Sequence, residues 1–135
     1  MATLLAKIQI HPGQENVFEE VMAYMYKQTH ETEDDVLRYE YWRGREPNFY
    51  YCLLSFKDSL SFWRHQASDH HEGEMERFAA CIADLDLEII DPVSDSSPLP
   101  ATNEMECPAD ESDAVKEMAG IYQIAINDWW KSLRK

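Results

Sequence analysis

Apolar residues alternate with polar ones in four short segments of the chain, and they recur every three or four residues in two longer segments. A period of two is typical of half-buried strands, whereas the wider spacing is typical of amphipathic helices. The pattern predicts strands over residues 3–10, 36–43, 49–56 and 85–90. It predicts helices over residues 14–30 and 69–83, with a short helix beginning after Asp58 and ending near Ala67.

The predicted elements follow one another as strand, helix, strand, strand, helix, strand. This βαββαβ order is that of a ferredoxin-like α+β fold, in which helices cover one face of an antiparallel sheet. The other sheet face then carries aliphatic and aromatic side chains that no helix covers. Because a monomer rarely exposes so large an apolar surface, we expect a second copy to cover it in a homodimer or a higher homo-oligomer.

The character of the sequence changes after Asp91. Prolines, serines and acidic residues then predict an irregular linker over residues 94–113. Beyond it, apolar residues fall on one helical stripe: Val115, Met118, Ala119, Tyr122, Ile126, Trp129 and Leu133. We therefore divide the chain into a core domain of residues 1–93, the linker, and a C-terminal amphipathic helix of residues 114–135. We expect this helix to dock on its own dimer, with another protein as the alternative partner.

Composition narrows the class of protein. A length of 135 residues suits one domain with an appendage. The formal net charge of −14 argues against nucleic acid or an anionic membrane as a partner. No apolar run approaches the roughly 20 residues of a membrane span, and the N-terminal residues lack signal-peptide features. The three cysteines are not clustered, so we expect reduced thiols and a cytoplasmic location.

Three of the five histidines lie at the predicted junction between the short helix and the longer one that Ser68 caps. His65 is the best candidate for a proton acceptor, because imidazole ordinarily titrates near neutral pH; alternatively, it braces the helix break. His70 lies in the first turn of the longer helix, where the helix dipole disfavours its charged form. It could assist His65 or simply pack. His71 is turned about 100° around the helix and is expected to point outward.

A metal site is not expected from the spacing. His70 and Glu74 share a helical face, but no third ligand follows at a fixed distance along the chain. Aromatic residues could instead wall a pocket for an aromatic ligand, although in strands they more often belong to a core or an interface. The candidates are Trp63, Tyr39, Tyr41, Trp42, Phe49 and Tyr51. Arg43 and Asn48, at the ends of a hairpin, could hold a substrate oxygen or be solvated.

Three motifs together carry a family resemblance. They are His11-Pro12-Gly13-Gln14, Tyr39-Glu40-Tyr41-Trp42-Arg43 and His65-Gln66-Ala67-Ser68-Asp69-His70. In this order and spacing the chain resembles the antibiotic biosynthesis monooxygenase family, whose members form a dimeric ferredoxin-like α/β barrel. The resemblance covers roughly residues 3–92 and does not extend to the tail.

The resemblance implies a cofactor-independent oxygenase that acts on a small quinol-like or polyphenolic molecule. Such a substrate, once deprotonated, passes an electron to oxygen itself, so the protein need only bind it, orient it and take a proton. On this interpretation the pocket lies between sheet and helices, His65 is the base, His70 assists, and Trp63, Tyr39 and Trp42 are aromatic walls. The partners are then the aromatic molecule and oxygen.

The sequence departs from the family pattern at several positions. Many relatives carry a glutamate in the third strand, where this chain has Leu54-Ser55-Phe56. Of the residues used by haem-degrading relatives, Trp63 matches, but Ala6 replaces an asparagine and Met75 falls near the place of a histidine. Haem binding or degradation is therefore less favoured. A non-catalytic module that binds a small ligand or drives assembly through the tail is the main alternative.

Overall fold

The computed structural model describes all 135 residues and contains four strands and five helices. The core domain runs in the order β1 (Ala2–Ile10), α1 (Glu15–Thr32), β2 (Val36–Arg43), β3 (Phe49–Phe56), α2 (Ser59–Gln66), α3 (Asp69–Cys81) and β4 (Ile82–Ile90). The strands form one antiparallel sheet in the order β2-β3-β1-β4. The predicted ferredoxin-like α+β fold is thereby confirmed.

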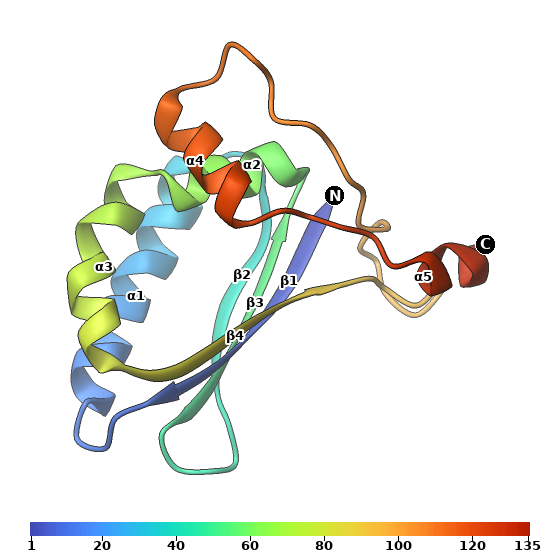
Figure 1. Cartoon of the computed structure of the whole chain (residues 1–135). Coiled ribbons are helices and arrows are strands. Elements are labelled where there is room, and N and C mark those ends of the chain that lie inside the picture. Colours follow the sequence, from blue (N-terminus) through green and yellow to red (C-terminus); the bar gives the residue numbers. More distant parts are fainter.

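Helices α1 and α3 lie on one face of the sheet (Figure 1). Alternation along β1 turns Leu4, Ala6, Ile8 and Ile10 toward these helices, and all four side chains are buried. From the other side, α1 contributes buried residues at three- and four-residue steps: Phe18, Val21, Met22, Met25 and Thr29. Burying a large apolar side chain contributes roughly 1.5–3 kcal/mol, so this layer contributes strongly to the stability of the fold.

The opposite face of the sheet divides into two halves. Over β2 and β3 it presents Trp42, Tyr51 and Leu53, with Trp42 paired to Tyr51 across the strands. Over β4 it is charged, because Lys7 forms ion pairs with Asp86 and Glu88. Glu40 lies opposite Leu53 on the same face and pairs with Arg38. The predicted apolar surface is therefore limited to the aromatic part of the β2–β3 half and does not include the β4 half.

The predicted border between α3 and β4 is wrong by a few residues. The helix was expected to reach residue 83 and the strand to begin at residue 85, whereas α3 ends at Cys81 and β4 begins at Ile82. Pairing with β1 explains the difference, because Ile10 pairs with Ile82 and His11 N donates to Cys81 O at 2.9 Å. Bonds to the sheet thus replace the last predicted turn of the helix.

The single C-terminal helix predicted over residues 114–135 is also wrong. The structure has two short helices, α4 (Asp113–Ile121) and α5 (Asp128–Leu133), joined by an extended segment. The backbone groups that would continue α4 are bonded elsewhere. Trp63 Nε1 donates to Tyr122 O at 2.8 Å, and Ile126 N donates to Glu104 Oε1 at 2.7 Å.

The two tail helices occupy different places on the molecule (Figure 1). Helix α4 docks on α2 of its own chain, where Tyr122 stacks edge-on against Phe62 with ring centroids 5.8 Å apart. Helix α5 lies beyond the end of β4, where Arg134 donates to Asp91 at 2.7 and 3.0 Å. None of the helices is both long and apolar enough to cross a membrane.

Candidate functional site

The bend between α2 and α3 fixes the positions of the histidines. Asp58 caps α2 by accepting from Ser61 N at 2.8 Å. Ser68 caps α3 and donates to His65 O at 2.7 Å, which ties the end of one helix to the start of the next. As a result, His65 in the last turn of α2 and His70 in the first turn of α3 both turn toward the end of α1.

Glu33 links the two histidines. Its Oε1 atom lies 2.8 Å from His65 Nδ1 and 3.0 Å from His70 Nε2. His70 Nε2 is also 3.3 Å from Thr29 Oγ1 and 3.3 Å from Ser68 Oγ. His65 is buried, whereas the side chains of His70 and Glu33 remain 10% and 17% exposed. These three residues are also the group of donors close enough together to hold a cation.

Burial sets the ionisation of this cluster. It raises the pKa of Glu33 to about 7, although the neighbouring His70 opposes the rise. It lowers the pKa of His65 to about 3, with a further contribution from the charge of His70. The pKa of His71 falls to about 3 for the same first reason. At neutral pH the imidazoles of His65 and His71 are therefore uncharged.

A groove of about 870 Å³ runs between α1 and the edge strand β2. Its lining is mostly apolar and aromatic: Phe18, Glu19, Met22, Ala23, Tyr26, Arg38, Glu40, Tyr41, Trp42, Arg43 and Tyr50. Arg43 and Tyr50 donate to Glu19, and the bond from Arg43 holds the pKa of Glu19 at about 2. This carboxylate is therefore fixed by these hydrogen bonds and ionised near neutral pH.

The interior between the sheet and the helices has little free space. The cavity there measures about 50 Å³ and is lined by Tyr39, Tyr41 and His71 among others. The rings of Tyr39 and Phe56 pack on His65, with centroids 4.9 and 5.1 Å away. The substrate-sized chamber expected beside His65 is thus filled by side chains, and the larger space lies in the groove. His71, expected to point outward, instead faces this interior.

The predicted substrate residues do not come together in one pocket. Trp42 and Arg43 line the groove, and Tyr39 reaches it only indirectly, through a 2.8 Å bond between its hydroxyl and that of Tyr41. Phe49 and Tyr51 pack on each other on the opposite face of the sheet. Asn48 forms the hairpin turn with a φ of 63°, and its carbonyl accepts from Ile10 N.

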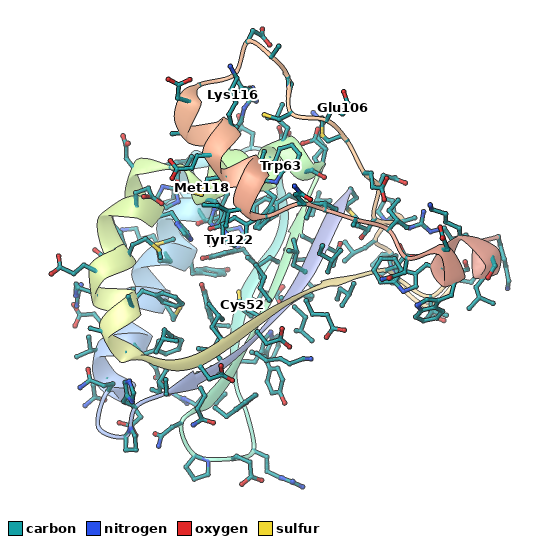
Figure 2. The ribbon with its side chains drawn as sticks, in the orientation of Figure 1. Cys52, Trp63, Glu106, Lys116, Met118 and Tyr122 are labelled. Atoms are coloured by element: carbon teal, nitrogen blue, oxygen red, sulfur yellow. The ribbon has the colours of Figure 1, made fainter.

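Trp63 is separated from the groove as well. Its indole lies beneath α4, near Tyr122 and Met118 (Figure 2). There it borders a surface hollow of about 610 Å³ between α2, α4 and the linker. The residue predicted as an aromatic wall of the pocket therefore anchors the tail.

Sequence reasoning missed several residues of the site. Glu33 belongs to an acidic run after α1, in which nothing distinguishes one carboxylate from its neighbours. Glu19 lies on the polar side of the first predicted helix and Tyr50 in the third predicted strand, and only the packing of α1 against β2 brings them to the groove. The strand alternation places Tyr50 on the face toward the helices, and this is the only sequence signal that it could reach a site there.

Comparison with solved structures supports the fold. A candidate antibiotic biosynthesis monooxygenase of Caulobacter crescentus superposes with a TM-score of 0.65 at 19% identity, over 68% of this chain and 89% of that one. A second candidate of the same kind, from Bacteroides thetaiotaomicron, gives 0.64 at 20% identity, over 78% and 95%. A conserved protein of Methanosarcina mazei gives 0.62 at 21% identity, over 66% and 89%.

No curated protein sequence matches the chain significantly. At these identities the likeness to solved structures establishes the fold alone. The sequence profile of the antibiotic biosynthesis monooxygenase family, in contrast, matches residues 1–77, which is more than half of the chain. This protein therefore belongs to the antibiotic biosynthesis monooxygenase family.

Proposed function

We propose that the protein is a cofactor-independent, monooxygenase-like enzyme that oxidises a small electron-rich aromatic molecule in the groove between α1 and β2. Family membership supports the reaction class. The observation that carries the proposal is the groove itself, because aromatic side chains from both walls line a space that accommodates a ring system. For an anthrone-like substrate, one methylene carbon and one oxygen molecule give one carbonyl and one water.

The proton acceptor in this proposal is His65. Burial lowers its pKa to about 3, so it is a weaker base than an exposed imidazole, and ionised Glu33 would stabilise the imidazolium that forms. When Glu33 is ionised its oxygen can only accept, so the imidazole proton of His65 lies on Nδ1, bonds to Glu33 and leaves the lone pair of Nε2 free. His65 Nε2 has no hydrogen-bond partner. A base oriented by a carboxylate in this way is a recurring arrangement in enzymes. His70 assists by holding the same Glu33 oxygen from the other side.

The route for the proton runs through two tyrosines. Tyr41 lines the groove, its hydroxyl lies 2.8 Å from that of Tyr39, and the ring of Tyr39 packs on His65. Burial raises the pKa of both phenols, so they stay neutral and can pass a proton only by accepting one and donating another. The last transfer requires the Tyr39 hydroxyl to reach His65 Nε2 directly or through one water.

Oxygen uptake with anthrone or hydroquinone tests the proposal. We expect the His65→Gln variant to lose roughly 10²–10⁴-fold in kcat, the usual contribution of a general base. His11→Gln, an exposed histidine, is the matched control and should keep the rate. Circular dichroism shows whether each variant is folded. Equal rates in folded His65→Gln and wild type would exclude His65 as the base.

The location of the substrate has its own test. Ala23 lines the groove and is exposed on α1, so Ala23→Trp should fill the groove without disturbing the core and should raise KM. Tyr24→Trp on the same helix lies outside the groove and should leave KM unchanged. An unaltered KM in Ala23→Trp would place the substrate elsewhere.

A non-catalytic binding module is the second candidate function. The observation that favours it is the filled interior, because Tyr39 and Tyr41 separate His65 from the groove. In that case an aromatic ligand would change the fluorescence of the wild-type protein on binding, and Ala23→Trp would abolish this change. Neither protein would consume oxygen.

The proposed enzyme is a cytoplasmic homodimer that pairs through the apolar β2–β3 half of the open sheet face. Exposed Trp42 and Tyr51 support this surface, because they are neighbours across two strands and a contiguous apolar patch usually marks an interface. Three unpaired cysteines support a reducing compartment.

A further inference from the structure

Three segments of the chain bring metal-binding side chains to one point. Glu33 is the C-cap residue directly after α1, His65 lies in the last turn of α2, and His70 lies in the first turn of α3. One ligand atom from each of the three falls within 4.8 Å of the others. Helix caps at Asp58 and Ser68 hold the two helices in place, so the convergence is built by the fold.

The donor set suits a divalent transition metal. Two imidazole nitrogens and one carboxylate oxygen are ligands that zinc and similar ions take in proteins. With bonds of about 2.0–2.1 Å, tetrahedral ligand atoms lie about 3.3 Å apart. The present separations from Glu33 Oε1 are 2.8 Å to His65 Nδ1 and 3.0 Å to His70 Nε2. An outward movement of a few tenths of an ångström would bring both of these pairs to that spacing, and the two imidazole nitrogens lie within 4.8 Å of each other.

Neighbouring hydroxyls complete the surroundings. Thr29 Oγ1 and Ser68 Oγ each lie 3.3 Å from His70 Nε2, where they can bond to a water that fills a fourth position. The side chains of Glu33 and His70 keep 17% and 10% of their surface exposed, which leaves a way in for an ion.

We propose that Glu33, His65 and His70 form a binding site for a divalent transition metal ion of the zinc class. The site cross-links the end of α1 to the bend between α2 and α3. Because side chains separate it from the groove, its role is structural: the ion stabilises the native arrangement of three helices.

The metal and the proposed proton transfer compete for the same side chains. An ion on His65 Nδ1 displaces the hydrogen bond that orients this ring as a base and places the imidazole proton on Nε2. If the proposed function is correct, zinc should therefore slow oxygen uptake. Metal binding itself does not depend on that function, and it is measured without any substrate.

Calorimetric titration of the full chain with zinc, and with cobalt followed by its visible absorption, tests the site. We expect one ion per chain, a rise in melting temperature, and the intense cobalt bands typical of four-coordinate nitrogen and oxygen ligands. His70→Gln and Glu33→Gln should each lower zinc affinity by more than the roughly 10–100-fold that loss of an outer partner costs.

The controls are matched by residue type and position. His71→Gln removes a neighbouring histidine whose ring lies 5.0 Å from that of His65 but which does not bond to Glu33. His11→Gln removes an exposed histidine. Both should bind zinc as wild type does, and a large loss in His71→Gln would show that the ligand set is wrong.

Two results overturn the proposal whether or not the variants fold. One is wild-type protein that binds no zinc or cobalt at micromolar concentrations. The other is a weak cobalt spectrum of an ion coordinated mainly by water, because a surface ion of that kind would not use three protein ligands.

Discussion

At the scale of single residues, the absence of a side chain on Gly44 sets the geometry of the β2–β3 hairpin. Gly44 N donates to Phe49 O at 2.7 Å. A Cβ atom on Gly44 would lie 2.9 Å from that same oxygen and 3.1 Å from the Phe49 ring. Because the nearest atom belongs to the backbone, it cannot turn away as a side chain would. Alanine at this position therefore has to separate the strands.

Two glycine substitutions test this explanation together. We expect Gly44→Ala to lower the free energy of unfolding by about 1–3 kcal/mol, the usual cost of forced overpacking. Gly73 lies exposed in α3 with nothing within 4 Å of its would-be Cβ, so Gly73→Ala should raise it by about 0.5–1 kcal/mol. Urea denaturation measures both. A Gly44→Ala protein as stable as wild type would mean that the close approach is relaxed in solution.

The sequence predicts those parts of the candidate site that depend on neighbouring residues, and it does not predict those that depend on distant ones. Cap residues around Ala67 located the helix break, so the meeting of His65 and His70 was predictable. The contribution of Glu33 was not, because its neighbours Glu31 and Asp34 offer the same chemistry and only the path of α1 selects among them. The low pKa of His65 was equally hidden, since it follows from burial by Tyr39 and Phe56.

At the scale of elements, periodicity located each strand and helix of the core domain because one side of each is buried. It failed where long-range contacts decide a boundary. Ile82 fits a helical stripe as well as a strand, and pairing with Ile10 decides in favour of the strand. The tail shows the same limit, because the bond from Trp63 to the Tyr122 carbonyl comes from a residue far away in the sequence.

The anchor of α5 is the ion pair between Asp91 and Arg134. The Asp91 side chain is 7% exposed and also accepts from Thr102 N at 2.9 Å. Burial acts against the charge of Asp91, but these hydrogen bonds outweigh it and hold the pKa of this carboxyl below its usual value. A lowered pKa in the folded state stabilises the fold above the unfolded value of about 3.9, and this contribution is lost as the pH falls further.

We therefore expect α5 to detach in acid. Fluorescence of Trp129 and Trp130 should change as the pH falls below about 4, while the far-ultraviolet circular dichroism of the sheet persists. Asp91→Asn should show the detached signal already at pH 7, with a loss of about 1–3 kcal/mol in the stability of the tail. Lys131→Gln, which breaks only an exposed pair with Asp128, is the control. An acid transition that is unchanged in Asp91→Asn would assign it to other carboxylates.

At the scale of the whole molecule, the open face of the sheet is asymmetric. Its β2–β3 half presents Trp42, Tyr51 and Leu53, whereas Lys7 and its acidic partners occupy the β4 half. A second copy related by twofold symmetry would cover the apolar half and leave the charged half in water. The net charge of −14 opposes any closer contact between two copies.

Light scattering during gel filtration tests this arrangement. We expect wild-type protein to elute as a dimer at micromolar concentration and Leu53→Lys to elute as a monomer, because a further charge beside Tyr51 and Trp42 is costly to bury. Tyr24→Lys alters an exposed residue on the helical side and should remain dimeric. A monomeric wild type, or a dimeric Leu53→Lys, would contradict pairing through this face.

The hydrogen bond from Trp63 to the Tyr122 carbonyl has a consequence while the ribosome synthesises the chain. The two residues are 59 positions apart, so at about 5–20 residues per second a ribosome needs roughly 3–12 seconds to add the second after the first. Until α4 emerges, the nascent core exposes the indole and the surrounding apolar surface of α2. Apolar surface exposed in this way makes a partly synthesised chain prone to aggregation.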